Sequence, residues 1–139
     1  MSVPYDLRML SLVVPCYNES ASIAGFFDCI VPILESIERI RFEIVLVNDG
    51  SSDDTLDQML AYARRDERVR VVDLTRNFGK EAALTAGLDE ALGDAVIPMD
   101  VDLQDPPSLI PELVARWREA RKSCWRNGAA ASAIPGSSA

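Results

Sequence analysis

Short apolar runs alternate with longer amphipathic segments along most of this chain, and this alternation limits the fold more than any other feature. The runs have the length of buried strands, and the segments between them space their apolar residues like one face of a helix. Such short intervals imply parallel strands joined by crossover helices. We therefore predict an α/β fold with an open, doubly wound, mostly parallel sheet and flanking helices. The predicted strands are 10–14, 43–47, 69–74 and 95–99, and the predicted helices are 23–37, 56–63, 80–92 and 109–120.

Prolines and capping residues set the expected boundaries. Pro15 ends the first predicted strand. Residues 18–20 offer capping side chains before the first helix, and Asp53 or Asp54 can cap the second. Pro98 would remove a hydrogen-bond donor from a central strand, so we expect the chain to leave the sheet there.

Size and composition are those of one soluble globular domain. The 139 residues suffice for a substantial core. No run approaches the roughly 18 apolar residues that cross a bilayer, and no secretory signal is visible, so we expect a cytoplasmic location. The net charge of -8 argues against nucleic acid as a partner. With three widely spaced cysteines and no histidine, reduced thiols are expected rather than a zinc site or disulfides.

A polar cluster follows each predicted strand. The clusters are residues 15–19, 48–54, 76–80 and 100–105. The carboxyl ends of parallel strands meet at one rim of the sheet, and ligands of open α/β sheets bind there. We therefore expect the four clusters to line one site.

The last cluster is the densest in carboxylates. Asp100, Asp102 and Asp105 stand beside the amide of Gln104, just before a Pro-Pro pair that stops any strand. Oxygen ligands this close suit Mg²⁺ or Mn²⁺, which keeps coordination positions for phosphate oxygens. The stretch therefore indicates phosphate-linked chemistry. The alternative is an acidic, solvated loop that caps the next helix.

Four motifs stand in these clusters: Val-Pro-Cys-Tyr-Asn-Glu at 14–19, Val-Asn-Asp-Gly-Ser-Ser-Asp-Asp-Thr at 47–55, Arg-Asn-Phe-Gly-Lys-Glu-Ala-Ala at 76–83 and Asp-Val-Asp-Leu-Gln-Asp-Pro-Pro at 100–107. Together they resemble the inverting GT-A glycosyltransferases of glycosyl transferase family 2. Within that family they are most similar to the enzymes that load sugars onto polyprenyl phosphates, such as dolichyl-phosphate mannose synthases and bactoprenol glucosyltransferases. The resemblance covers residues 9–120 and implies a Rossmann-like GT-A sheet that is incomplete at its C-terminus.

The resemblance implies a donor-binding role for the first two motifs. Pro15, Tyr17 and Glu19 fall on the segment that shapes the nucleotide pocket, with Tyr17 against the base or ribose and Glu19 accepting from ribose hydroxyls. Asp49 matches the acid that accepts from an N–H of the base. The alternatives are a strand stop with a helix cap for the first motif, and an Asp-Gly turn for the second.

The other two motifs match the diphosphate end of the donor. Asp102 and Gln104 fall on the metal-contacting positions, and Asp100 is directed at the ribose or the water shell of the ion. Asp100 and Asp102 are therefore the implied catalytic residues. A divalent ion, Mg²⁺ or Mn²⁺, would offset charge on the leaving nucleoside diphosphate. Arg76 and Lys80 are candidates for donor phosphate contacts, although lone basic residues near a helix start are often only solvated.

The implied reaction is a single in-line displacement at the anomeric carbon of a UDP- or GDP-sugar, with inversion. The implied acceptor is a lipid phosphate, specifically a polyprenyl phosphate. Its oxygen is already anionic near neutral pH, so no strong general base is needed. A full-length relative would work at the cytoplasmic face of the membrane.

The chain departs from the family pattern near its end. We divide it into an N-terminal extension (1–8), the nucleotide-sugar-binding half of a GT-A domain (9–120) and a tail of small residues that we expect to be disordered (121–139). The sequence reads as the donor-binding half of a longer enzyme, truncated or frame-shifted near position 121. The exposed edge of such a half-sheet favours pairing with a second copy.

Two other functions stay open. One is a catalytically inactive nucleotide-binding or self-associating fragment, which would bind donor at most. The other is a flavodoxin-like receiver that accepts phosphate, which also carries acids at its strand ends. A receiver would need a lysine at the end of its last strand, and we find none.

Overall fold

Strands and helices alternate through the whole described part of the chain, as the sequence pattern predicts. The computed structural model describes residues 8–127, with side chains as far as residue 121. The elements are β1 (Arg8–Cys16), α1 (Ile23–Ser36), β2 (Ile40–Asn48), α2 (Thr55–Arg65), β3 (Val69–Asp73), α3 (Lys80–Glu90), β4 (Ala95–Pro98) and α4 (Leu109–Asn127).

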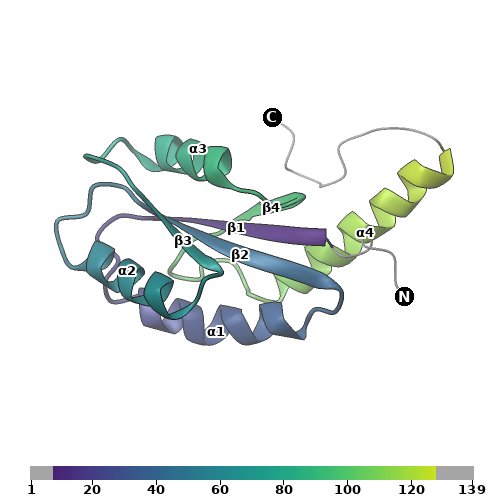
Figure 1. Cartoon of the computed structure of the whole chain (residues 1–139), viewed down its shortest axis with the longest axis horizontal. Coiled ribbons are helices and arrows are strands. Elements are labelled where there is room, and N and C mark those ends of the chain that lie inside the picture. Colours follow the sequence, from purple (N-terminus) through teal and green to yellow (C-terminus); the bar gives the residue numbers. More distant parts are fainter. Residues whose placement is uncertain (1–7, 128–139) are drawn as a thin grey trace.

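The four strands form one parallel sheet in the order β3-β2-β1-β4. Helix α3 covers one face of this sheet, α1 and α2 cover the other, and α4 lies beside α1 (Figure 1). The predicted α/β class, parallel sheet and flanking helices are therefore confirmed. The chain order runs outward from β1 in both directions, which makes the carboxyl ends of β1 and β4 the point where strand order reverses.

The core fills both faces of β1 and β2. On one face, Leu12 of β1 is buried against Phe26 and Ile30 of α1. On the other, Val13 and Val47 pack with α3, which comes unusually close: a Cβ added at Gly87 would lie 2.4 Å from Val13 Cγ1. Because both faces are covered, the central strands read as continuous apolar runs.

The central strands are longer than predicted. Pairing of β1 with β2 starts at Arg8 and continues to Cys16, so Pro15 lies inside β1 rather than ending it. The reason is the side to which Pro15 points. The carbonyl of Val13 accepts from Met99 on the β4 side, and Pro15, two residues on, faces the same side beyond the end of β4. No ladder donor is lost there.

β4 lies at the edge of the described sheet, not in its centre as predicted, because it pairs only with β1 there. The expected exit of the chain is confirmed, since the strand ends at Pro98. An edge position tolerates proline because the strand needs donors on one side only.

The predicted cap of α1 is wrong. Its N-cap is Ser22, which makes no side-chain capping bond. The side chain of Asn18 instead accepts from the backbone N–H of Ser52 at 2.8 Å, so it ties the loop after β1 to the loop after β2. At α2 the N-cap is Asp54, one of the two predicted capping residues, but it makes no side-chain capping bond; the preceding Asp53 accepts from the N–H of Thr55 at 2.9 Å.

The predicted domain boundaries fall inside observed elements, because Arg8 belongs to β1 and α4 continues to Asn127. The division into an extension, a donor-binding half and a tail stays a prediction. The rest of the predicted extension and tail, residues 1–7 and 128–139, lies outside the described residues. None of the helices in 8–127 is both long enough and apolar enough to cross a membrane.

A buried carboxylate closes the amino end of the sheet. Glu43 of β2 is 2% exposed and accepts from the hydroxyl of Ser11 at 2.6 Å and from the N–H of Leu92 at 2.6 Å. Arg70 of β3 completes the group with an ion pair to Glu43 at 3.1 Å, and Gly93 donates to Ser11 Oγ at 2.8 Å. We call these five residues the Glu43 cluster. It joins β1, β2, β3 and the turn before β4.

Candidate functional site

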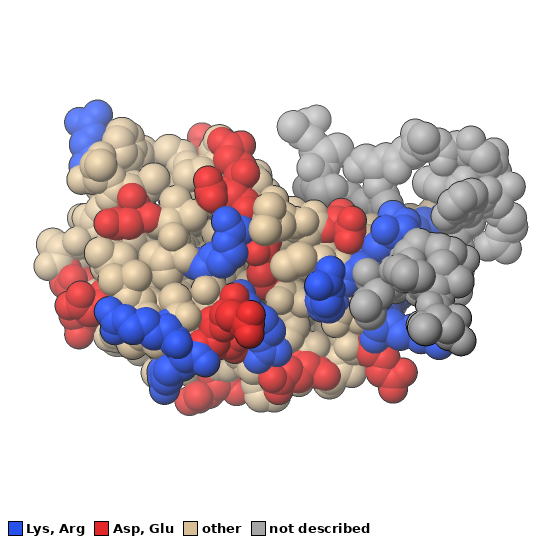
Figure 2. Space-filling view, viewed as in Figure 1, with Lys and Arg blue, Asp and Glu red and all other residues tan. Residues whose placement is uncertain are grey.

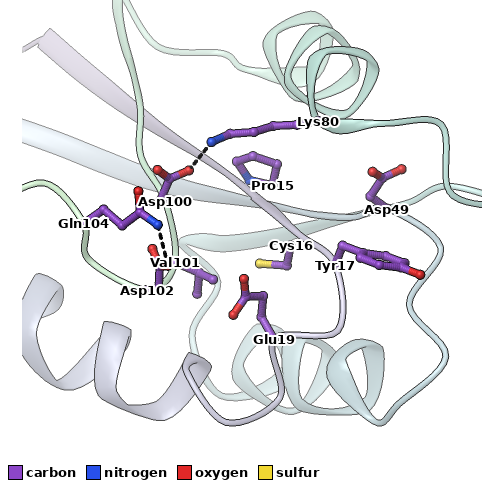
Figure 3. Close-up of a pocket in the computed structure, with 10 residues that line it drawn as sticks. All are labelled: Pro15, Cys16, Tyr17, Glu19, Asp49, Lys80, Asp100, Val101, Asp102 and Gln104. Atoms are coloured by element: carbon purple, nitrogen blue, oxygen red, sulfur yellow. Dashed lines mark hydrogen bonds and ion pairs between the residues drawn. The ribbon is translucent and has the colours of Figure 1, made fainter.

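A cavity of about 180 Å³ opens at the carboxyl ends of β1, β2 and β4 (Figure 3). It is lined by Pro15, Cys16, Tyr17, Glu19, Asp49, Lys80, Asp100, Val101, Asp102 and Gln104. Every predicted site residue except Arg76 is in this set. The expectation that the four clusters share one rim is therefore confirmed in position, while the roles of the residues stay predictions.

The loop after β1 forms one wall. Tyr17 is 50% exposed, so its ring is available as a flat surface at the cavity mouth. The loop itself is held in place: the N–H of Asn18 donates to Ser51 Oγ at 2.9 Å, and the N–H of Glu19 donates to Thr55 Oγ1 at 3.0 Å. Two loops that follow neighbouring strands thus fix each other, and Tyr17 and Glu19 stand on a rigid support.

Cys16 also lines this wall, and sequence reasoning gave it no role. Burial raises the pKa of its thiol to about 12, with a smaller contribution from the nearby Glu19 carboxylate. The thiol is therefore neutral at physiological pH and is neither a nucleophile nor a soft metal ligand. Its place in the cavity follows from the extension of β1 beyond Pro15.

Asp49 lies directly after β2 and is 3% exposed. Its Oδ1 accepts from the N–H of Phe78 at 2.8 Å, and its Oδ2 accepts from the N–H of Gly79 at 3.2 Å. The side chain of Asn77 donates to Oδ2 at 3.3 Å and to the Asp49 carbonyl at 3.1 Å. The carboxylate therefore holds the loop before α3 as well as lining the cavity.

Lys80, the first residue of α3, reaches across the cavity to Asp100 (Figure 3). Its Nζ lies 2.7 Å from Asp100 Oδ1. The pKa of Lys80 is raised, chiefly by its hydrogen bond to Asp100; desolvation, the second-largest cause, lowers it, and the charges of Asp100, Asp102 and Asp105 raise it further. A permanent cation thus stands among the carboxylates.

The loop after β4 turns sharply to form the opposite wall. Asp100, Asp102 and Gln104 line the cavity together with the buried Val101, whereas Leu103 packs against the core. Leu103 adopts a φ of 58°, which a branched side chain rarely does, and its N–H donates to the Asp100 carbonyl at 3.1 Å. Strained backbone of this kind marks places where geometry serves a function.

Asp102 and Gln104 fit a hard divalent cation. Gln104 Nε2 donates to Asp102 Oδ2 at 3.0 Å, a bond that places the two side chains together and uses the amide nitrogen, not its oxygen. Across residues 8–121, no three or more His, Cys, Asp and Glu side chains gather as a metal cage. A site with few protein ligands is what Mg²⁺ uses when substrate phosphates supply the remaining oxygens.

Arg76 does not reach the cavity. Its guanidinium lies 4.8 Å from the centre of the Phe78 ring, a cation–π contact on the outside of the loop. Of the two predicted phosphate contacts, the structure brings only Lys80 to the site. The two residues share one motif, but the loop places their side chains on different sides.

The cavity has a clear electrostatic character. Glu19, Asp49, Asp100 and Asp102 line it, and Lys80 is the basic residue among its lining side chains. An anionic ligand bound here needs a further cation to offset this acidity. The arrangement can therefore hold a divalent ion together with a phosphate-bearing molecule.

Comparison with known proteins gives a family. Residues 11–126 match the family described as Glycosyl transferase family 2. The prophage bactoprenol glucosyl transferase homolog of Escherichia coli is 50% identical over 109 residues, which are 78% of this chain and 35% of the relative. The chain spans about a third of the length of the curated relatives it matches. The match also extends past residue 120, where we predicted the resemblance to end.

Solved structures share the fold. TarS of S. aureus, a structure in complex with UDP-GlcNAc, has a TM-score of 0.64 and 27% identity, covering 81% of this chain and 32% of that chain. A mannosyltransferase from Pyrobaculum calidifontis, in complex with GDP-Man and Mn²⁺, has a TM-score of 0.57 and 26% identity, covering 70% of this chain and 32% of that one.

Proposed function

Because this chain belongs to glycosyl transferase family 2, we propose that it carries the nucleotide-sugar-binding part of a glycosyltransferase that acts on a polyprenyl phosphate. The observation that carries the proposal is the cavity at the strand ends, where Lys80, Asp102 and Gln104 line one space. Bactoprenol glucosyl transferases among its relatives support the acceptor class. The chain covers about a third of the Escherichia coli relative, so sugar transfer by this chain is part of the proposal.

The donor is a UDP- or GDP-sugar, as in the two related structures. The half-exposed ring of Tyr17 offers a stacking surface for the base or ribose, and Glu19 accepts from ribose hydroxyls. For Asp49 the predicted bond from a base N–H stays a prediction, since the loop before α3 already donates to its carboxylate.

The diphosphate lies between Lys80 and the Asp102–Gln104 pair in this proposal. Asp102 and Gln104 would hold Mg²⁺ or Mn²⁺, with Asp100 beside them, and the Pyrobaculum enzyme with Mn²⁺ supports such an ion. The ion supplies charge compensation for the departing nucleoside diphosphate. Lys80 exchanges its ion pair with Asp100 for a phosphate oxygen of the donor.

The reaction is an in-line displacement at the anomeric carbon with inversion. The acceptor phosphate oxygen attacks, the bond from the anomeric carbon to the diphosphate breaks, and the nucleoside diphosphate leaves with the electron pair. The acceptor is anionic near neutral pH, so no side chain has to remove a proton. A full-length relative with this role would work at the cytoplasmic face of the membrane.

Titration calorimetry tests the donor site. We expect the purified chain to bind UDP or GDP in the presence of Mn²⁺ and to lose that binding in chelator. Asp102→Ala should weaken it about 100-fold, as expected for loss of a metal contact. Asp105→Ala is the matched control: it removes a charge from the same acidic stretch but from outside the cavity lining, and should bind normally.

A catalytically inactive donor-binding or self-associating fragment is the second candidate. It is favoured by the outer edge of β4, which has no strand partner among the described residues. Assays of sugar transfer to a polyprenyl phosphate, with the molecular mass in solution, separate the two. Donor binding without transfer, by a dimeric chain, would favour the fragment.

A further inference from the structure

We propose that Asp49 is a positioning residue for Lys80: its carboxylate anchors the segment 76–80 and so determines where the Lys80 ammonium stands in the cavity. The inference rests on the proposed function, in which Lys80 binds the diphosphate of the nucleotide-sugar donor. It assigns to Asp49 a contribution to phosphate binding that does not require contact with the base.

The anchoring contacts converge on one buried carboxylate. Phe78 donates its N–H to Oδ1 at 2.8 Å, and Gly79 donates its N–H to Oδ2 at 3.2 Å. Asn77 adds a side-chain bond to Oδ2 at 3.3 Å. Asp49 is 3% exposed, and the bonds to its carboxylate are partly buried, so breaking them leaves backbone donors of this segment without an acceptor.

Gly50 provides a second, independent contact between the same two segments. It has a φ of 70°, and a Cβ added there would lie 2.2 Å from the backbone nitrogen of Asn77 and 2.3 Å from the carbonyl carbon of Arg76. The backbone of segment 76–80 therefore rests directly on the Asp49-Gly50 turn. A side chain at position 50 would push the segment away.

The start of α3 connects the anchored backbone to Lys80. Gly79 has a φ of 106°, and its carbonyl accepts from the N–H of Ala83 at 3.0 Å as the first turn of the helix. Lys80 follows immediately, and its Nζ lies 2.7 Å from Asp100. The Lys80 side chain is 62% exposed, so packing alone does not hold it. Its position depends on the backbone from which it starts.

Substituting Asp49 by asparagine tests the anchor with little change in shape. An amide has one accepting oxygen, so in either orientation its NH₂ group faces a donor of segment 76–80. We expect the Phe78 and Gly79 amides to exchange hydrogen at least about tenfold faster in Asp49→Asn, in fully folded protein. Asp54→Asn removes the same charge from the loop before α2, where the Asp54 carboxylate accepts from the side chain of Gln58, and should leave this exchange unchanged. Unchanged exchange in Asp49→Asn would overturn the proposal.

A double-mutant cycle tests the consequence for ligands. We expect Asp49→Asn and Lys80→Met each to weaken Mn²⁺-dependent binding of UDP, or of GDP if that is the nucleotide bound, about tenfold. Inorganic pyrophosphate, which has no base, should be weakened to a similar extent. The double variant should be no worse than Lys80→Met alone, because the two act through one group. Additive losses, or loss of nucleotide binding with normal pyrophosphate binding, would show that Asp49 contacts the base instead.

The two proposals fail in different ways. If the wild-type chain binds neither nucleotide nor pyrophosphate, the proposed function fails, while hydrogen exchange still decides whether Asp49 anchors the segment. If the wild-type chain binds and the cycle is additive, the donor site stands and the positioning role fails. Asn77→Ala gives a graded check, because it removes only the side-chain bonds and should raise exchange less than Asp49→Asn.

Discussion

The two ends of this sheet use the same kind of side chain in opposite ways. At the amino end, the Glu43 carboxylate is 2% exposed and receives donors from three other segments. At the carboxyl end, Asp100 and Asp102 line an open cavity, and the side chain of Asp100 is 27% exposed. Figure 2 shows that acidic and basic side chains elsewhere on the viewed face are interspersed.

The two ends differ in whether the protein or a ligand supplies the groups that compensate the carboxylate charge. Ser11, Leu92 and Arg70 all donate hydrogen bonds to the Glu43 carboxylate, so the amino end of the sheet contributes to stability. The carboxylates of the cavity have Lys80 as their nearby cation, and its raised pKa reflects several acids. Where the protein balances the charges of a site only in part, a bound ion or ligand can balance the rest. Stability and binding are thus separated along the strands.

The largest effect is expected from removing Glu43. Glu43→Ala should lower the free energy of unfolding by about 3 kcal/mol, because it removes the buried partner of Arg70 and leaves the Ser11 hydroxyl and the Leu92 N–H without their acceptor. Urea denaturation measures the change. Glu90→Ala is the control, since Glu90 also pairs with Arg70 but is 53% exposed, and should cost less than about 0.5 kcal/mol. Equal losses of stability in the two variants would mean that Glu43 contributes no more than an exposed ion pair does.

A smaller effect is expected from acid. Burial raises the pKa of Glu43, but bonds from Ser11 and Leu92 and the charge of Arg70 outweigh it, so the pKa lies below its ordinary value of 4.5. The stabilisation is therefore complete above the unfolded pKa and is lost as the pH falls through the folded value. The stability gap between wild type and Glu43→Gln should narrow below about pH 4.5. A gap that stays constant down to pH 3 would contradict this.

The smallest effect is expected at the cavity. Asp102→Ala should change the free energy of unfolding by less than about 0.5 kcal/mol, because Asp102 is exposed and its hydrogen-bond donor is the neighbouring Gln104. Thermal unfolding without nucleotide and metal provides the measurement. A loss of stability as large as that of Glu43→Ala would mean that the carboxylates at both ends of the sheet stabilise the fold.

The fold was predictable because local patterns determined it. Every predicted strand and helix is present, since apolar spacing reports burial directly. β1 and β2 were predicted too short because their pairing extends over polar residues that look like loop, such as Arg8 opposite Ile40, whereas β3 and β4 each end one residue earlier than predicted. The helix after the acidic stretch was cut at 120 because the small residues beyond it suggested disorder, while its backbone runs to Asn127.

The site was predictable in membership but not in contacts. Motif positions brought all but Arg76 to the cavity, because strand ends meet at one rim. Arg76 was misplaced because a short loop can send neighbouring side chains to opposite sides. The bonds from segment 76–80 to Asp49, and the whole Glu43 cluster, join residues dozens of positions apart. No local pattern encodes such pairs.

The proline in β1 has a lasting consequence for the cavity. Pro15 points to the side where β4 has already ended, and it carries no N–H. Further pairing between β1 and β4 at this end would therefore lack the donor that an N–H at position 15 would supply. A residue with an N–H at position 15 would leave an unpaired backbone donor there, with which another strand could pair. The proline thus removes one donor that would favour an extension of β4 along this side of the cavity.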